Sequence, residues 1–255
     1  MSQHVLFEKY DASAAITLNG PDKLNAWTES MRDEIIGHLD DLKANPDIRT
    51  VVITGSGEGF CAGQDLAETA SMSPDDHAAA EAWIDGFDRL YRAIRDLDQI
   101  TIAAVNGIAA GSGFQFALLA DLRVGDSKVR MGQPEVLSGI PSITGIWAMW
   151  SILGRSKTSQ FALTGELVDA AEAQRLGLLN YLADDGAVLD YAKELAARLS
   201  TLPPGAVRLT KNRLRGLEED TLSDAIIEAK RVHREAYGTG EPQREMTRFL
   251  AGRTR

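Results

Sequence analysis

The chain contains 255 residues, 44% of them hydrophobic, which is enough to bury the core of one large α/β domain or two small ones. Its 27 basic and 37 acidic side chains give a formal net charge of −10, which disfavours nonspecific binding to nucleic acid or to an anionic membrane. The opening residues include no apolar stretch of signal-peptide length, and the single Cys61 excludes an internal disulfide, so we expect a cytoplasmic protein.

Predicted strands and helices alternate over the first half of the chain. In order, they are strands 5–10 and 14–18, a helix from Thr28 to about Pro46, a strand 50–54, a helix 76–95, a strand 100–105, a helix 111–120 and strands 121–125 and 128–131. Apolar residues at helical spacing, such as Phe87 and Tyr91, define the face of 76–95 that is buried. This succession predicts a mainly parallel α/β sheet whose loops gather at one edge.

The chain beyond Gly139 is predicted to be helical. The segments are 143–153, 157–163, 170–176, 187–200, 205–216 and 222–237. We expect a helical subdomain over residues 201–255, packed on the core or on a neighbouring subunit. The apolar positions that motivate subunit contacts are Leu189, Leu195, Leu199, Ile226 and Ile227.

Two uncharged stretches, 99–120 and 136–154, approach the length of a membrane-spanning helix. Glycines and polar residues interrupt both, as at Asn106, Gly113 and Pro141. These interruptions divide each stretch into strands, turns and helices of a buried core, so no membrane span is predicted.

Two glycine-rich segments, each placed directly after a predicted strand, carry the chemical signal. The first is Gly59–Leu66 and the second is Asn106–Gly113. An enolate requires two hydrogen-bond donors that converge on one oxygen, and backbone N–H groups at glycine-rich turns and helix starts can supply them. Either segment alone is equally compatible with a plain connection between elements.

Taken in order, several segments resemble the signatures of the enoyl-CoA hydratase/isomerase (crotonase) family. They are Phe-Cys-Ala-Gly-Gln-Asp-Leu at 60–66, Asn-Gly-Ile-Ala-Ala-Gly-Ser-Gly at 106–113, Gly-Gln-Pro-Glu at 132–135 and Gly-Ile-Pro at 139–141, supported by Pro-Asp-Lys-Leu-Asn-Ala at 21–26. The resemblance implies an α/β fold with ββα repeats that form a spiral core over residues 1–200, which binds an acyl-CoA, and a C-terminal helical subdomain. It also implies a homotrimer or a dimer of trimers, no permanently bound cofactor, and coenzyme A as part of the substrate.

The resemblance assigns roles to individual residues. It implies that the backbone N–H groups of Gln64 and Ser112 form the oxyanion hole, and that Glu135 and Gln115 occupy the two acid/base positions. The chain departs from the hydratase pattern because Gln115 is an amide, which cannot exchange a proton as a carboxyl group does. Glu135 alone can still move a proton between two carbons. Without the resemblance, Glu135 reads as a surface carboxylate and Gln115 as a satisfied buried amide.

The resemblance further implies contacts to coenzyme A. The candidates are Lys23, Ala62, Asp65, Leu66 and Gly111, with Arg253 as a contact to coenzyme A of an adjacent subunit. A second departure lies in Pro-Ser-Ile-Thr-Gly at 141–145, where Ile143 and Trp147 suggest an altered acyl pocket. Trp147, Met149 and Trp150 are also compatible with a place in the core.

The function predicted from the sequence is therefore isomerisation or hydration of an enoyl-CoA. Decarboxylation, hydrolysis and retro-aldol cleavage on the same scaffold remain alternatives, as does a catalytically idle relative that binds acyl-CoA. A dinucleotide-binding fold is disfavoured because the G-x-G-x-x-G spacing is absent, and the four histidines are too dispersed to suggest a metal site.

Overall fold

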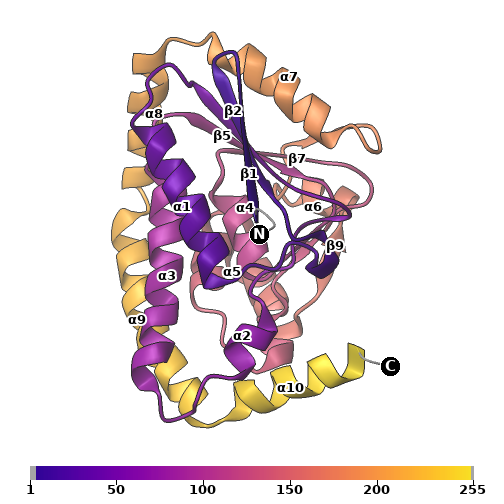
Figure 1. Ribbon diagram of the computed structural model, residues 1–255, viewed down its shortest axis with the longest axis vertical. Helices are drawn as coiled ribbons and strands as arrows, with labels where there is room; N and C mark the ends of the chain where they lie inside the picture. The colour runs from indigo at the N-terminus through magenta and orange to yellow at the C-terminus, as the bar shows by residue number, and fades with distance from the viewer. Residues whose placement is uncertain (1–3, 254–255) are drawn as a thin grey trace.

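The computed structural model describes residues 4–253, with the side chain of Arg253 outside the described part. Two β-sheets form its framework (Figure 1). The larger sheet has the strand order β1 (Val5–Tyr10), β2 (Ser13–Leu18), β3 (Thr50–Gly55), β5 (Ile100–Val105), β7 (Leu122–Gly125) and β10 (Tyr181–Leu182). Only the β1–β2 pair is antiparallel there, so the predicted mainly parallel sheet is confirmed.

The smaller sheet takes two of its strands from the glycine-rich segments, which were expected to be loops, and a third overlaps the predicted strand 128–131. Its order is β4 (Gly59–Cys61), β6 (Ile108–Ala110), β8 (Arg130–Gly132) and β9 (Leu167–Asp169). Both glycine-rich segments thus contain a paired strand, and the loop interpretation was wrong for these residues. Three residues are too few to show a period-2 pattern, which is why the second sheet was not predicted.

Strands β3, β5 and β7 of the larger sheet are each followed by a strand of the smaller sheet and then by helical structure. The helical elements are α2 (Leu66–Ala70) and α3 (His77–Arg95) after β4, α4 (Ser112–Leu119) after β6, and η2 (Pro134–Ser138) and α5 (Thr144–Thr164) after β8. This is the ββα repeat of a spiral core. Asn106 connects two repeats, since its side chain accepts a hydrogen bond from Gly55 N at 3.1 Å and donates to Gly55 O at 2.9 Å.

Strand alternation decides which helices cover each face of the larger sheet. Val51 and Ile53 belong to the main core with helix α1 (Glu29–Lys43) and α3, whereas Val52 packs with α7 (Val188–Ser200) on the opposite face. Thr28 caps α1 by accepting from Met31 N, as its position in the sequence predicts. The remaining short elements are η1 (Pro21–Lys23) and α6 (Ala170–Arg175).

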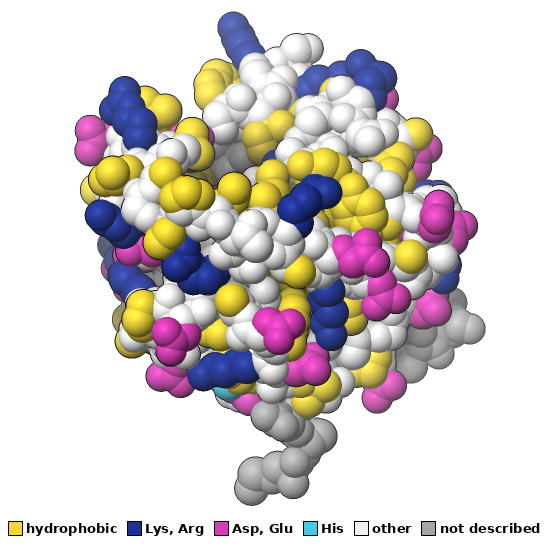
Figure 2. Space-filling model, turned by 90° about the horizontal axis from the view of Figure 1, so that it is seen from above, with side chains coloured by type: hydrophobic (Ala, Val, Ile, Leu, Met, Phe, Trp, Pro, Cys, Tyr) yellow, Lys and Arg dark blue, Asp and Glu magenta, His cyan; other side chains and the backbone are white. Residues whose placement is uncertain are grey.

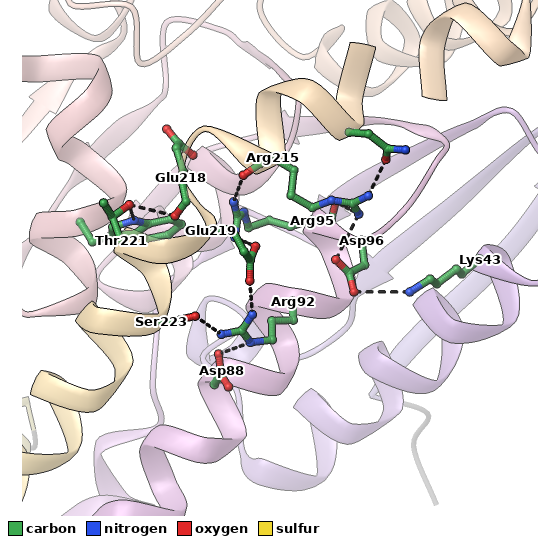
Figure 3. A network of polar contacts seen from close by, with 12 residues as sticks. Lys43, Asp88, Arg92, Arg95, Asp96, Arg215, Glu218, Glu219, Thr221 and Ser223 are labelled. Atoms are coloured by element: carbon green, nitrogen blue, oxygen red, sulfur yellow. Dashed lines mark hydrogen bonds and ion pairs between the residues drawn. The ribbon is translucent and has the colours of Figure 1, made fainter. Parts of the chain in front are cut away.

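The carboxyl-terminal helices fold back over the core (Figure 1). They are α8 (Pro204–Gly216), α9 (Glu219–Gly238) and α10 (Glu241–Arg253); α10 is not among the predicted helices. Helix α9 packs along α3, and α10 packs against α2 and η2. Ion pairs connect α8 and α9 to α3 (Figure 3). Glu219 pairs with both Arg92 and Arg95, and Arg215 pairs with Asp96.

Helix α5 consists of two helical parts on either side of Gly154. The sequence predicts separate helices at 143–153 and 157–163, and a sharp kink at Gly154, whose φ is 62° and ψ is 178°, divides Thr144–Thr164 at this place, so the predicted pair is confirmed. Only glycine adopts this conformation readily.

No helix within residues 4–253 is long and apolar enough to cross a membrane. Stretch 99–120 divides into β5, β6 and α4, and stretch 136–154 divides between η2 and α5. On the face shown in Figure 2, acidic and basic side chains are interspersed among apolar ones rather than segregated by sign.

Candidate active site

The smaller sheet brings the two glycine-rich segments together. Strand β4 pairs in parallel with β6, which places Cys61 beside Ala109. Beyond β4, Trp27 N donates to Gly63 O at 2.9 Å and Asp65 N donates to Trp27 O at 3.1 Å. These bonds fix the backbone on both sides of Gln64 without using the N–H of Gln64.

The second predicted donor, the N–H of Ser112, lies at the start of α4 and next to Gly63. A Cβ added to Gly63 would lie 3.4 Å from Ser112 N and 2.8 Å from Ala110 O, so the two backbones approach as closely as glycine allows. The Ser112 hydroxyl accepts a hydrogen bond from the indole Nε1 of Trp27 at 3.2 Å. Neither N–H of the pair Gln64 and Ser112 donates to an acceptor within the described part of the chain.

Gly111 shapes the turn into α4 and faces the candidate acid/base. Its φ of 58° and ψ of −130° lie in a region that L side chains avoid. A Cβ at this position would lie 2.9 Å from Oε1 of Glu135. Glycine is therefore required here both by the backbone and by the space that the carboxylate occupies.

Glu135 is held on η2 with one carboxyl oxygen bonded and the other unpaired. Oε1 accepts a hydrogen bond from Gln115 Nε2 at 3.1 Å. Oε2 is buried and has no hydrogen-bond partner among residues 4–253. Burial raises the pKa of Glu135 to about 7, and the interactions with its own backbone N–H and with the side chains of Gln115 and Gln133 offset this only in part. A carboxyl group of this pKa can accept or release a proton near neutral pH.

Gln115 is 3% exposed and all of its acceptor capacity is used. Its Oε1 accepts from the hydroxyl of Tyr91 at 2.7 Å and from Oγ1 of Thr144 at 2.8 Å. Tyr91 comes from α3, Gln115 from α4, Thr144 from α5 and Glu135 from η2. Of the two interpretations that the sequence left open, the structure therefore shows a satisfied amide, and one that also contacts Glu135.

Tyr91 and Thr144 were missed by the sequence analysis. The sequence places Tyr91 on the apolar face of its helix, and it shows Thr144 only as part of the segment 141–145. A buried tyrosine hydroxyl normally has a hydrogen-bond partner, and the apolar face of this helix supplies none. A partner from another element could therefore have been expected. Burial raises the pKa of Tyr91 well above its usual value, so the hydroxyl stays protonated and can donate.

Most of the candidate coenzyme A contacts lie between η1, which ends at Lys23, and α2, which begins at Leu66. Lys23 Nζ forms an ion pair with Asp65 Oδ2 at 2.5 Å, and Asp65 Oδ1 also accepts from Ala67 N, which caps α2 at Leu66. Ala62 N donates to Leu24 O. Lys23, Ala62, Asp65 and Leu66 are thus gathered at one edge of the site, while Gly111 lies apart from them beside Glu135. The side chain of Arg253 lies outside the described residues.

Asn25 holds this edge in place, although the sequence analysis used it only as part of a motif. Its Oδ1 accepts from Gly20 N at 2.8 Å, and its Nδ2 donates to Ser56 O at 2.9 Å and to Gly59 O at 2.7 Å. The Asn25 side chain therefore connects the backbones of three separate turns. Asn25 itself has a φ of 57°, which asparagine tolerates better than most residues.

Several side chains singled out from the sequence have structural places. Cys61 is fully buried in the main core, and burial raises its pKa to about 12, which confirms its interpretation as a packing residue. Met149 is buried, but Trp150 is 51% exposed, so a core position for Trp150 was wrong. Ile143 and Trp147 pack beside Ile84 and Leu222, between α3 and α9.

A surface hollow lies away from these residues. Its lining includes Lys43, Arg49, Gln99, Leu202 and Arg208, at the amino ends of β3 and β5. It belongs to the end of the molecule that faces the viewer in Figure 2. The glycine-rich segments follow the carboxyl ends of the same strands, so this hollow is not the candidate site.

Comparison with known proteins agrees with this arrangement. The family model described as enoyl-CoA hydratase/isomerase matches residues 8–254. A probable enoyl-CoA hydratase of Mycobacterium leprae is 32% identical over 98% of this chain and 95% of its own, and the 1,2-epoxyphenylacetyl-CoA isomerase of Escherichia coli is 30% identical over 100% and 98%. The crystal structure of an enoyl-CoA hydratase/isomerase from Mycobacterium paratuberculosis superposes with a TM-score of 0.89 at 26% identity and covers 97% of this chain and 99% of its own. The fold is that of the crotonases, and the chain belongs to the enoyl-CoA hydratase/isomerase family.

Proposed function

We propose that this protein isomerises the double bond of an enoyl-CoA thioester, with the N–H groups of Gln64 and Ser112 as the oxyanion hole and Glu135 as the single acid/base. The observation that carries the choice of reaction is the state of Gln115. Its carbonyl oxygen has two lone pairs, and Tyr91 and Thr144 use both.

Hydration requires an acceptor that orients and deprotonates the attacking water. Gln115 offers only N–H hydrogens, because its oxygen is already saturated and an amide does not take up a proton at neutral pH. Glu135 could serve one proton transfer of a hydration, but within residues 4–253 no other carboxylate is among the groups that shift its pKa. This favours a reaction that needs one proton acceptor over a reaction that needs two.

The proposed sequence conserves protons. Oε2 of Glu135 removes a proton from the carbon next to the thioester carbonyl, and the electron pair moves onto the carbonyl oxygen. The N–H groups of Gln64 and Ser112 and the amino end of α4 stabilise that oxyanion. As the enolate collapses, Glu135 returns the proton to the carbon at the far end of the conjugated system, and the double bond has moved by one position.

The coenzyme moiety would lie along the edge formed by Lys23, Ala62, Asp65 and Leu66. Lys23 is 64% exposed at its side chain and can turn from Asp65 toward a phosphate, while the buried Asp65 keeps the hydrogen bond from Ala67 N. No permanently bound cofactor enters this proposal, since coenzyme A arrives and leaves with the acyl group. The relatives named above act on, or are named for, CoA thioesters, which supports the substrate class.

We also propose a homotrimer or a dimer of trimers. Four of the residues used to predict subunit contacts need revision. Leu195 and Ile226 are buried within the chain, and Leu189 and Leu199 pack against the hydrophobic cluster between α7 and the larger sheet. Ile227 is 68% exposed, and Leu209 and Leu217 on and after α8 are about as exposed. Light scattering at micromolar concentration tests this, and a monodisperse monomer would contradict it.

The test of the proposed reaction compares Glu135→Gln with the unaltered enzyme on 3-enoyl-CoA and 2-enoyl-CoA substrates. Isomerisation should fall by about 10² to 10⁴, as expected for the loss of a positioned acid/base group. Glu166→Gln, which alters a carboxylate outside the site, is the matched control. Wild-type activity that is chiefly hydration and unaffected by Glu135→Gln would overturn both the reaction and the residue.

A further inference from the structure

We propose that the hydroxyls of Tyr91 and Thr144 are positioning groups that fix the amide of Gln115, so that Gln115 holds Oε1 of Glu135 and leaves Oε2 as the one oxygen that exchanges protons. This inference rests on the proposed function. It assigns a role to two residues of α3 and α5 that do not touch the reacting carbons.

The direction of the Gln115 amide follows from its neighbours. Oε1 of Glu135 lies 3.1 Å from Gln115 Nε2, a position where a carbonyl oxygen would repel the carboxylate. On the other side, two hydroxyl groups lie 2.7 Å and 2.8 Å from Gln115 Oε1 and can both donate. The carboxylate decides the orientation, since it can only accept from the N–H of Gln115, whereas the hydroxyls can donate or accept. A reversed amide would lose the hydrogen bond to Glu135 and would leave both hydroxyl hydrogens without the acceptor that they now use.

The two hydroxyls are themselves held. The Tyr91 ring packs against Phe87 with centroids 5.8 Å apart, and Tyr91 is 1% exposed. Thr144 is the first residue of α5, and a Cβ on the adjacent Gly145 would lie only 2.2 Å from Gln133 Nε2, so the start of α5 cannot shift toward η2. Four elements thus set the position of one amide.

The consequence is an unequal pair of oxygens on Glu135. Oε1 accepts from Gln115 and lies against Gly111, where even a methyl group would be at 2.9 Å. Oε2 is buried and unpaired within residues 4–253. A carboxylate that is anchored through one oxygen cannot rotate freely, so both proton transfers pass through the other oxygen.

The charged and titratable groups around the network are few. Tyr91 is the titratable group that faces Glu135, and Arg32 of α1 and Cys61 of β4 act on Tyr91 with opposite signs. The hydrogen bond from Gln115 lowers the pKa of Glu135. Loosening the amide should therefore raise the pKa of Glu135 further and move the acidic limb of the kcat/KM profile to higher pH.

The experiment measures kcat, KM and the pH profile of Tyr91→Phe and Thr144→Val on the enoyl-CoA that the wild type isomerises. Each variant should lower kcat by about 3- to 10-fold, with KM nearly unchanged and the acidic limb shifted upward, because each removes one hydrogen bond to Gln115. Thr144→Ser keeps the hydroxyl and should restore both kcat and the profile. Tyr10→Phe and Thr158→Val, which remove buried hydroxyls that have no partner, are the matched controls and should leave both unchanged.

The possible outcomes separate this inference from the proposed function. If Glu135→Gln is inactive while Tyr91→Phe and Thr144→Val keep the wild-type pH profile, the positioning role is wrong and the acid/base assignment stands. If kcat falls in these variants with no shift of the limb and no rescue by Thr144→Ser, the hydroxyls are structural only, which also overturns the inference. If Glu135→Gln retains activity, the proposed function itself fails.

Discussion

Two polar clusters that share helix α3 show how burial changes what a polar contact does. Tyr91 faces inward and, with Gln115, Thr144 and Glu135, forms a network of hydrogen bonds that contains one ionisable carboxyl group near neutrality. Its neighbour Arg92 faces α9 and joins the ion pairs of Figure 3, where the Glu219 side chain is 40% exposed.

The difference lies in the solvent. Glu219 is 40% exposed, so water partly screens its ion pairs with Arg92 and Arg95, and each pair contributes little beyond holding α9 against α3. The inner network is shielded from water, so a single hydrogen bond changes the pKa of Glu135 and with it the chemistry. Changes to the inner network and to the backbone beside it should therefore affect turnover, and changes to the outer cluster should affect stability alone.

The largest effect is expected at the backbone donor of Ser112. Ser112→Pro deletes the N–H at the start of α4 and should abolish turnover, whereas Ser112→Gly keeps the N–H and should be tolerated in turnover. Ser112→Gly leaves Trp27 Nε1 without its acceptor, at a cost of about 1 kcal/mol in the free energy of unfolding. Equal kcat values for the two variants would contradict a role for the backbone N–H.

A second carboxylate should change the reaction that the inner network supports. Gln115→Glu places an acceptor close to Oε1 of Glu135, and we expect hydration of a short 2-enoyl-CoA to rise about tenfold above the wild-type level. The two carboxyl groups would raise each other's pKa, so the gain should appear in a pH series and be largest above neutral pH. Hydration that stays at the wild-type level at every pH would show that the missing carboxylate is not what limits it.

The sequence predicts the framework of this molecule better than it predicts the inner network. Strands 50–54 and 100–105 and the helix of Tyr91 follow from apolar periodicity. Gly63 lies where two backbones meet, and Gly111 lies against the Glu135 side chain. Tyr91 and Thr144 are 53 residues apart, and nothing local indicates that their hydroxyls converge on Gln115. The raised pKa of Glu135 is likewise a property of burial by several elements, which no single segment encodes.

The protonation of Glu135 should be visible in stability as well as in turnover. The folded protein binds this proton more tightly than the unfolded chain, since the pKa is about 7 rather than 4.5. The stabilisation is complete below about pH 4.5 and is lost as pH rises through 7, by at most about 3 kcal/mol. Glu135→Gln should flatten this part of the profile in urea unfolding, and an unchanged slope in the variant would place the titration on another group.

The smallest effect is expected in the outer cluster, where Glu219 accepts from Arg92 and from Arg95 Nη1, the latter at 3.2 Å. Glu219→Gln removes the charge but not the volume, and it should lower the free energy of unfolding by about 0.5 to 1 kcal/mol in low salt and by less in 1 M salt. Arg95 is not stranded, because Nη2 still donates to Arg215 O at 3.2 Å and the guanidinium lies over the Trp147 ring. Glu228→Gln, which breaks an exposed pair with Arg231 within α9 itself, is the matched control and should have a smaller effect. Because no charge of the outer cluster is among the groups that shift the pKa of Glu135, kcat and its pH profile should not change. A shift of the acidic limb in Glu219→Gln would mean that the two clusters are coupled.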